Sequence, residues 1–351
     1  MATAANTATE SGVDIENVLK DVLNTIDRER EREIVSRRFG LYDRKETLEQ
    51  IGELLGITRE RVRQLEKVVI SKLKQAGNSG QLPGLDKVES AILEILSNNG
   101  QIMRANELAG LLTKNGSKID QSRISFLAEL SPALSALEES DHFFNSVGVR
   151  SVHDEKHIRE QIGKIVEAIK KIGEPTTIKA VAEAIGDTNS DHVAALASCS
   201  KSLAQLNGRW GLTKWPMVNP KNIRDKIYVI LSENGKHMHF NEIAESIRES
   251  DFKRKNVTTQ AIHNELIKDK RFVLIGRGIY ALQEWGYKKG TVSDTITEVL
   301  KDAGEPLHRD EIVKRVLKSR HVKETTILLN LQGKPQFKRV AKATYGLAEV
   351  A

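Results

Sequence analysis

Four polar side chains that can read DNA bases lie close together near residue 60. Arg59, Glu60, Arg63 and Gln64 stand at the beginning of a run whose aliphatic residues recur at helical spacing. Arginine pairs with guanine, glutamine pairs with adenine, and glutamate can accept a hydrogen bond from cytosine. Because a recognition helix meets the major groove mainly through its N-terminal residues, this placement predicts that these four side chains contact base edges.

The residues around this group predict a helix-turn-helix. Thr47 and Gln50 have the spacing of a capping box, which begins the first helix. Gly56 allows a sharp turn, and Thr58 caps a second helix over about 59–74. The buried face of that second helix is predicted to consist of Val62, Leu65, Val69, Ile70 and Leu73. The alternative is an ordinary exposed helix carrying surface ion pairs, for example between Arg63 and Glu66.

Three pieces of sequence in this region resemble region 4 of the sigma-70 family. They are RRFGL at 37–41, TLEQIG at 47–52 and LGITRERVRQLE at 55–66, and the resemblance covers about residues 27–75. It implies that the helix-turn-helix reads a −35 promoter element with the four residues named above. It also implies phosphate contacts by Thr58, Arg61 and Lys67, and binding of the flap of the RNA polymerase β subunit by residues 28–41.

The residues before this module contain little that could open a promoter. Residues 1–13 are polar and predicted to be disordered. Residues 14–26 are predicted to form one amphipathic helix, which gives a helical module over 14–75. Sigma factors melt DNA with an aromatic-rich helical domain, so we expect this chain to be sigma-like without being a self-sufficient sigma factor.

The composition of the 351 residues is that of a charged protein without membrane-spanning runs. It is 29% charged and 5% aromatic, with a net charge of +6. The excess is concentrated in residues 218–351, where 25 basic and 17 acidic residues give +8. A basic segment attracts polyanions such as nucleic acid. The single cysteine, Cys199, is expected to be a small core residue, and we expect a cytoplasmic, nucleoid-associated protein.

The sequence after residue 85 repeats four times. When the repeats are aligned on four glycines, the positions eight and four before and eight and twelve after each glycine are all aliphatic. The glycines are Gly100, Gly173, Gly235 and Gly304. Each repeat predicts a helix that ends at the glycine, a short extended link and a second helix.

A third helix and a small hairpin are predicted to complete each repeat as a winged helix. The third helices are expected at about 122–129, 191–200, 258–268 and 324–331. The fold class is therefore mainly α, with an N-terminal helix-turn-helix followed by four tandem winged-helix units. These cover residues 86–150 (unit 1), 156–216 (unit 2), 221–286 (unit 3) and 291–350 (unit 4). In unit 1 the segment DHFFNSVGV keeps aromatic residues but departs from the hairpin pattern of the others, so the pattern does not fix its wing.

Units 3 and 4 resemble the HARE-HTH winged helix, most clearly in RFVLIGRGIYAL and LHRDEIVKRV. That family includes the delta subunit of some bacterial RNA polymerases, so the resemblance implies a role with nucleic acid or polymerase. Unit 3 is the best candidate for DNA binding. Its predicted phosphate contacts are Lys253, Arg254, Lys255, Thr259, His263, Arg271 and Arg277.

The third helices of units 1 and 2 differ from that of unit 3. In unit 2 the segment DHVAALASCSKSL is nearly free of charge and is predicted to be a packing or partner surface. In unit 1 only Arg123 is expected to face outward.

These observations favour a DNA-binding transcription protein that is not an enzyme. The sequence has no glycine-rich phosphate loop, nucleophile elbow or metal-ligand spacing, so no catalytic residue, metal, cofactor, small-molecule substrate or membrane contact is expected. The expected partners are double-stranded DNA and core RNA polymerase. One alternative is a scaffold that links polymerase to other proteins through its winged helices. Another is a DNA-recognition subunit that serves a restriction or repair enzyme in trans.

Overall fold

The computed structural model describes residues 13–252, 254, 256–287 and 290–348. The chain divides into two compact bodies, Met1–Lys214 and Trp215–Ala351, which are described separately below. Among the described residues, every helix is too short or too polar to span a lipid bilayer. The predicted disordered tail, 1–13, lies almost wholly outside the described residues.

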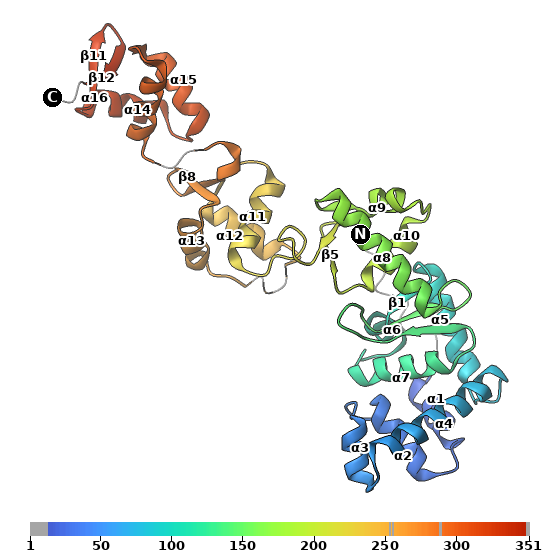
Figure 1. The fold of residues 1–351 in the computed structure, drawn as a ribbon. Helices are drawn as coiled ribbons and strands as arrows, with labels where there is room; N and C mark the ends of the chain where they lie inside the picture. Colours follow the sequence, from blue (N-terminus) through green and yellow to red (C-terminus); the bar gives the residue numbers. More distant parts are fainter. Residues whose placement is uncertain (1–12, 253, 255, 288–289, 349–351) are drawn as a thin grey trace. The chain divides into compact units, whose positions relative to one another are not determined.

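The first body begins with a four-helix module and continues with two winged helices (Figure 1). The module contains α1 (Ile15–Asn24), α2 (Glu29–Phe39), α3 (Leu48–Leu55) and α4 (Arg59–Asn78). Unit 1 contains α5 (Leu85–Asn98), β1 (Ile102–Arg104), α6 (Ala105–Leu112), α7 (Lys118–Leu130), β2 (Leu134–Leu137) and β3 (Ser146–Val149). Unit 2 contains α8 (Glu155–Ile172), β4 (Thr176–Thr177), α9 (Ile178–Ile185), α10 (Ser190–Ser198), β5 (Leu203–Leu206) and β6 (Arg209–Leu212).

The second body contains the other two winged helices. Unit 3 comprises α11 (Ile223–Asn234), β7 (Met238–His239), α12 (Phe240–Glu249), α13 (Thr259–Lys268), β8 (Phe272–Gly276), β9 (Ile279–Leu282) and a 3-10 turn, Gln283–Trp285. Unit 4 comprises α14 (Val292–Ala303), β10 (Leu307–His308), α15 (Arg309–Ser319), α16 (Glu324–Gly333), β11 (Phe337–Ala341) and β12 (Thr344–Leu347).

All four repeats have the same sheet topology, which confirms winged-helix units. The extended link after the first helix pairs antiparallel with the last strand of the hairpin, so each sheet has three strands where the sequence predicted two. Unit 1 has this sheet as well, in the order β1-β3-β2, so its doubtful wing is present. The aligned glycines all adopt positive φ, between 66° and 80°. This conformation is favourable only for glycine, which explains why these residues end the first helices.

The aliphatic positions of the repeat form the cores of the units. Fifteen of the sixteen are buried, and the exception is Ile185 in unit 2, which is half-buried. Each unit has about 60 to 70 residues, and a chain this short buries only a limited fraction of its surface. The core of each unit is therefore small. Contacts between neighbouring modules therefore add apolar burial that the separate units lack.

The third helix of unit 1 forms the joint with the N-terminal module. Figure 1 shows α7 lying against the helices of that module. One continuous hydrophobic core runs from α1, α2 and α4 into α5 and α7, across the predicted boundary between residues 75 and 86. The helices approach so closely that a Cβ on Gly77 of α4 would lie 2.2 Å from the carbonyl oxygen of Leu130. The Phe39 and Phe126 rings are 4.9 Å apart across the same joint.

Arg123 lies inside this joint, so the prediction that it faces outward is wrong. The residue is 9% exposed. Nε donates to the carbonyl oxygen of Leu41 at 2.9 Å, and Nη1 donates to Glu16 at 3.0 Å. The sequence pattern placed Arg123 opposite the apolar face of a single winged helix. It did not show that a second module covers that side of the helix.

The third helix of unit 2 forms a second joint, with unit 1. A Cβ on Gly100 would lie 2.7 Å from the carbonyl oxygen of Asp191 in α10. The Phe144 amide donates to the Cys199 carbonyl at 2.9 Å. The Arg104 guanidinium, which lies 4.2 Å from the centre of the Phe144 ring within unit 1, donates to the Ser198 carbonyl of unit 2. The aromatic segment that broke the hairpin pattern of unit 1 therefore serves this joint. Cys199 is fully buried beside it, as expected, and burial raises the pKa of its thiol.

A chain of polar groups crosses the same joint at His153, which is fully buried. His192 Nδ1 lies 3.2 Å from the Asp187 carboxylate, and its Nε2 lies 3.1 Å from Nε2 of His153. If His192 donates to Asp187, His153 must be the donor in the second bond. Its Nδ1 then finds no hydrogen-bond partner in the part of the chain that the structure describes.

The third helices of units 3 and 4 are not used in this way. The two units are joined through Arg320 of unit 4, which donates to the Leu274 carbonyl in the wing of unit 3 and to Thr295, both at 3.2 Å. The main packing partners of α13 are α11, α12 and β8, and those of α16 are α14, α15 and β11. Each of these helices therefore packs mainly within its own unit.

The burial of His153 predicts acid sensitivity of unit 2. Desolvation, with the neighbouring His192 and His157, lowers the pKa of His153 from 6.5 to about 4. The unfolded chain therefore takes up a proton between pH 6.5 and 4 that the folded chain does not. Stability is fully present above pH 6.5, and we expect it to fall by about 3 kcal/mol as the pH approaches 4.

The measurement is urea unfolding of the full chain with Trp215 and Trp285 changed to Phe, so that Trp210 in unit 2 reports alone. His153→Gln removes the titrating group and should flatten the pH dependence. His142→Gln, at an exposed position, is the matched control and should retain it. If His153→Gln loses as much stability on acidification as the protein with His153, another group is responsible.

Candidate nucleic-acid interface

The turn between α3 and α4 is built as the sequence predicts. The Thr47 hydroxyl and the Gln50 side chain form a reciprocal capping box at the start of α3. Gly56 ends that helix with φ 63°, and Thr58 caps α4 by accepting from the Arg61 amide. A separate small core beneath the turn contains Ile34, Ile51 and Val62. The angle between the two helices is therefore fixed by backbone and core.

Gly52 is needed for the two helices to approach each other. The Ile57 amide donates to the Gly52 carbonyl at 2.9 Å. A Cβ at Gly52 would lie 2.7 Å from the Ile57 carbonyl oxygen, which is backbone and cannot move aside easily. A larger residue here would force α3 away from the start of α4.

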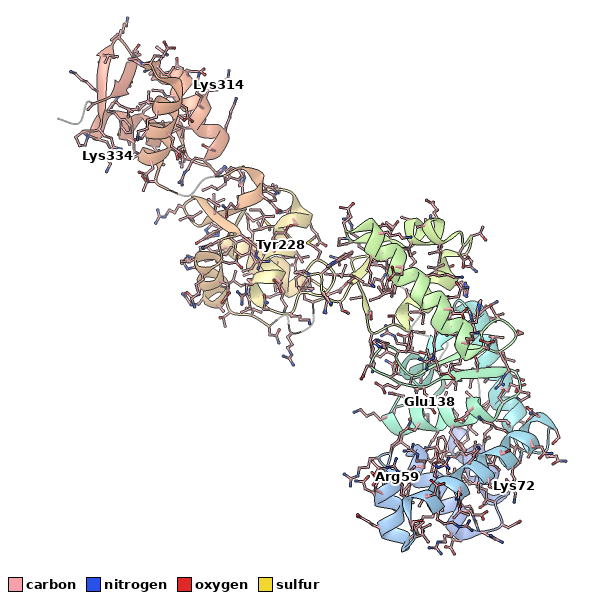
Figure 2. All side chains as sticks on the ribbon, viewed as in Figure 1. Arg59, Lys72, Glu138, Tyr228, Lys314 and Lys334 are labelled. Carbon is pink, nitrogen blue, oxygen red and sulfur yellow. The ribbon has the colours of Figure 1, made fainter. Side chains whose placement is uncertain are left out.

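The four predicted base-reading residues are all exposed on the first turns of α4. Arg59, labelled in Figure 2, is 68% exposed, and its guanidinium lies 2.8 Å from the Glu49 carboxylate on α3. Arg63 makes a two-pronged contact with Glu60, at 2.8 and 2.7 Å. Gln64 donates to the same carboxylate at 3.3 Å. Arg63 and Gln64 are therefore paired with Glu60, and Arg59 is paired with a residue of the preceding helix.

Contacts with DNA can replace these exposed ion pairs. Exposed ion pairs are weak because water and salt compete for both partners. The hydrogen bonds from Arg63 lower the pKa of the Glu60 carboxyl to about 2, so Glu60 is an acceptor at every physiological pH. Glu49 was not among the predicted site residues. Its position in the first turn of α3, opposite Arg59, could not be deduced without the angle between the helices.

The predicted phosphate contacts of α4 lie beside this tip. Thr58, Arg61 and Lys67 are exposed. The N-terminus of α4 also presents the positive end of the helix dipole, which favours an anion. The other end of α4 is occupied, because Val69 and Leu73 join the core with unit 1 and Lys74 pairs with Glu129 at 2.8 Å. Lys72, also labelled in Figure 2, remains exposed.

The predicted polymerase-binding half of the module, residues 28–41, is only partly accessible. Val35 and Leu41 are fully buried in the core shared with unit 1, and Ile34 is buried beneath the turn. Arg28, Glu29 and Arg30, at the start of α2, are exposed. A partner that touches α2 can therefore meet this end of the helix.

The predicted phosphate contacts of unit 3 fall into three groups. Lys253 and Lys255 lie outside the described residues, and Arg254 and Arg277 are exposed. Thr259 accepts from Arg248 at 3.2 Å, and His263 packs between the rings of Phe240 and Tyr280. These last two side chains are therefore already engaged by their own unit.

Arg271 is placed differently from the prediction. Its guanidinium contacts Asp269 at 2.8 Å and Asp225 at 3.3 Å, and the hydrogen bond to Asp269 raises its pKa. It also lies over the ring of Tyr228, a residue labelled in Figure 2. Two carboxylates neutralise this charge, so Arg271 functions in the fold of unit 3 more than as a free cation.

Sequence reasoning missed two polar residues on the accessible face of α13. Gln260 and Asn264 are exposed, lie one turn apart, and share a hydrogen bond of 3.1 Å. Both side chains can pair with adenine. The signal was present, because they lie opposite the buried Ile262 and Leu266 in the helical pattern. Neither residue carries a charge, so neither has the character of a phosphate contact.

Comparison with known proteins identifies the N-terminal module. Residues 28–75 match the family model for sigma-70, region 4, and are a region 4 domain. Among the relatives is the RNA polymerase sigma factor SigA of Listeria monocytogenes, which is 46% identical over 65 residues. SigA proteins of Listeria innocua and a Bacillus species match equally well. In each case the match covers 18% of this chain and 17% of the relative, so the chain spans about a sixth of their length.

This match confirms the sigma-70 resemblance and supports a DNA-binding, transcription-associated role for the module. It does not extend to the winged helices. The resemblance of units 3 and 4 to the HARE-HTH family therefore stays a prediction.

The exposed tip of α4 predicts a loss of sequence preference when Arg59 is removed. Arg59→Ala should weaken binding to the preferred duplex by about 1–3 kcal/mol and relax the preference at one base position. Arg44→Ala removes an equally charged exposed residue from the loop before α3 and is the control. Binding-site selection measures both. If Arg59→Ala retains the wild-type motif at full strength, Arg59 is not a base reader.

Proposed function

We propose that this protein binds promoter DNA through its region 4 domain and reads a −35-like element with Arg59, Glu60, Arg63 and Gln64. The observation that carries the proposal is the exposure of these four side chains together at one end of α4, while the other end is buried against unit 1. Only the end that can enter a major groove is left free. A recognition helix meets the major groove mainly through its N-terminal residues, so this exposure is what base reading requires.

The second part of the proposal is an association with RNA polymerase. The relatives are named as RNA polymerase sigma factors, and the transfer of that partner to this chain rests on the region 4 domain. The exposed start of α2, with Arg28, Glu29 and Arg30, is the surface that we assign to the β flap. Because the match covers 17% of SigA, other activities of sigma factors are not transferred. In this proposal the chain docks on polymerase or promoter and does not itself melt DNA.

The third part concerns units 3 and 4, which we propose add DNA contacts with little sequence preference. Their support is the charge of residues 218–351, with 25 basic and 17 acidic residues, and the polar exposed face of α13. A protein of this kind works in the cytoplasm at the nucleoid and has no catalytic role.

A scaffold function is the second candidate, and one observation in unit 4 favours it. The third helix α16 contains no basic residue, and its Leu329 is 69% exposed. Exposed leucine on a helix face is more typical of protein contacts than of DNA contacts. The basic residues of unit 4, including Lys334 in Figure 2, lie outside that helix.

The proposed association with RNA polymerase predicts that this chain binds core polymerase but does not start transcription. The full chain should co-elute with core RNA polymerase and protect a −35-like element in a footprint. Core enzyme and this chain alone should produce no abortive RNA from a linear promoter. Abortive RNA would contradict the proposed lack of melting activity. A failure to co-elute at low salt would contradict the association with polymerase.

The charge of unit 3 predicts a specific salt dependence, which the fragment 215–351 can report because it is a compact body with its own cores. If Lys253, Arg254 and Lys255 each neutralise one phosphate, changing all three to Ala should flatten the log–log salt slope by about 2.7 units. The control is the triple change of Lys301, Lys314 and Lys318 to Ala, which removes the same charge from α14 and α15.

Salt titration of both variants on duplexes of two unrelated sequences separates the possibilities. An equal loss of slope in the control would mean that net charge, and no particular face, attracts DNA. An unchanged slope in the first variant would show that residues 253–255 do not contact DNA phosphates.

A further inference from the structure

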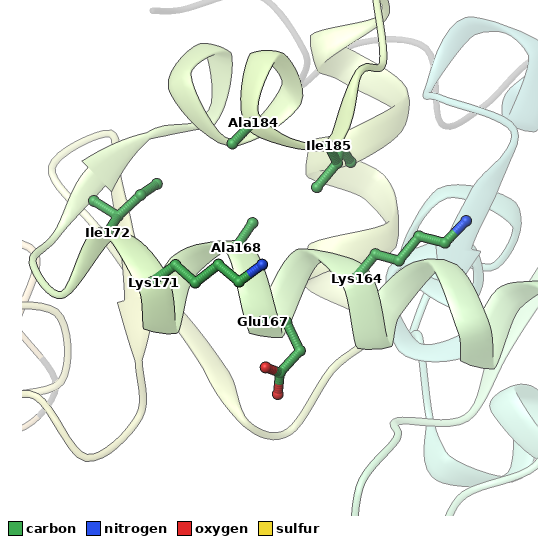
Figure 3. Close-up of a pocket in the computed structure, with 7 residues that line it drawn as sticks. All are labelled: Lys164, Glu167, Ala168, Lys171, Ile172, Ala184 and Ile185. Carbon is green, nitrogen blue, oxygen red and sulfur yellow. The ribbon is translucent and has the colours of Figure 1, made fainter.

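Unit 2 has an open apolar groove between α8 and α9, shown in Figure 3. Its volume is about 390 Å³, within the range of about 300–1,000 Å³ that is usual for binding pockets. Ala168 and Ile172 of α8 face Ala184 and Ile185 of α9 across it. Lys164, Glu167 and Lys171 complete the lining.

The groove is open because the link between the second and third helices of unit 2 does not cover the core, as the same link does in units 3 and 4. Ile185 occupies the repeat position that is buried in the other three units. The links from the second to the third helix explain the difference between unit 2 and units 3 and 4. In unit 3 this link contributes the buried Phe252, and in unit 4 it contributes Val322, which packs on the core. In unit 2 the link is the polar tetrapeptide GDTN at 186–189, so nothing from it can cover Ile185.

A second aliphatic residue is exposed where the repeat does not require one. Ile172 directly precedes the glycine that ends α8, and the equivalent residues are Asn99, Asn234 and Ala303. Its side chain is 36% exposed. Unit 2 therefore adds apolar surface at the position where two of its fellow units carry asparagine.

The rim of the groove is positively charged. The Glu167 carboxylate accepts from Lys170 at 2.9 Å and points away from α9, so its charge is neutralised outside the groove. Lys164 and Lys171 have no ion-pair partner among the described residues and are exposed. They lie two helical turns apart, roughly 10 Å along α8.

We propose that this groove docks an acidic amphipathic helix of a partner protein. Aliphatic side chains one turn apart on that helix would fill the space over Ala168, Ile172 and Ile185. Its Asp or Glu residues would pair with Lys164 and Lys171. A trough between two helices accepts a third helix, because ridges of side chains on one pack into grooves of the other. A second copy of the same groove would bring lysines against lysines, so self-association through this face is disfavoured.

The proposal is independent of the region 4 function, and its test uses the full chain. The probe is a fluorescein-labelled peptide of about 16 residues, with leucines on one helical face and glutamates beside them. Its partner is a scrambled peptide of the same composition whose leucines share no face. Fluorescence anisotropy should show that the amphipathic peptide binds at least about tenfold more tightly than the scrambled one.

Two variants locate the binding site. Ile172→Asp should weaken binding of the amphipathic peptide by about tenfold or more, while Leu317→Asp, at a comparably exposed position of α15 (38% against 36%), should not. The double reversal Lys164→Glu and Lys171→Glu should abolish binding of the acidic peptide. It should also create binding of a peptide in which lysines replace the glutamates. Such a switch in charge preference cannot come from misfolding.

Three results would overturn the proposal. The scrambled peptide could bind as well as the amphipathic one. Leu317→Asp could weaken binding as much as Ile172→Asp. A short DNA duplex could displace the peptide from the wild type and fail to bind the double-reversal variant, which would assign the two lysines to nucleic acid instead.

Discussion

Burial of a third helix against its neighbour is the constraint on which the first body of this protein depends. A winged helix of 60 to 70 residues has a small core, and its third helix has one side free to contact something else. In unit 1 that side is taken by the region 4 domain, with Arg123 donating to Leu41 and Glu16. In unit 2 it is taken by unit 1, along α10. The helix that commonly meets DNA in such folds is thus used here to join modules.

This use of α7 and α10 explains where external partners can be met. In the first body, α4 is buried at one end and exposed at the end that carries Arg59, Glu60, Arg63 and Gln64. In the second body, α13 and α16 pack mainly within their own units. Their faces differ, since α13 presents Gln260 and Asn264 while α16 presents Leu329. The four copies of one fold have therefore diverged into two joints, one polar surface and one apolar surface.

The sequence predicted what depends on local pattern. The capping box at Thr47, the left-handed Gly56 and the aliphatic positions around the four glycines follow from helix geometry and backbone preference, and the structure confirms them. The family resemblance of residues 28–75 was equally accessible, because its motifs are contiguous in sequence.

What the sequence did not predict depends on contacts between residues that are far apart in the chain. The sequence predicted that Arg123 is exposed. In the structure α1 and Leu41 cover it. Phe143 and Phe144 lie in a segment that did not fit the hairpin pattern. In the structure their backbone pairs with Cys199 and Ser200. Arg271 was predicted to be a free cation. The fold brings Asp225, which lies 46 residues away in the chain, to its guanidinium. Each of these partners is distant in sequence and shares no repeating pattern with the residue it holds.

The two joints are expected to hold region 4 and units 1 and 2 together as one rigid body, and the distance between two spin labels measures this. Spin labels on cysteines introduced at the exposed Glu53 of α3 and Glu183 of α9 span both joints. Cys199, the only native cysteine, is replaced by Ala in the same chain. Pulsed electron spin resonance should give one narrow distribution, unchanged when DNA is added. A broad or multiple distribution would show that the joints are loose and would contradict the account.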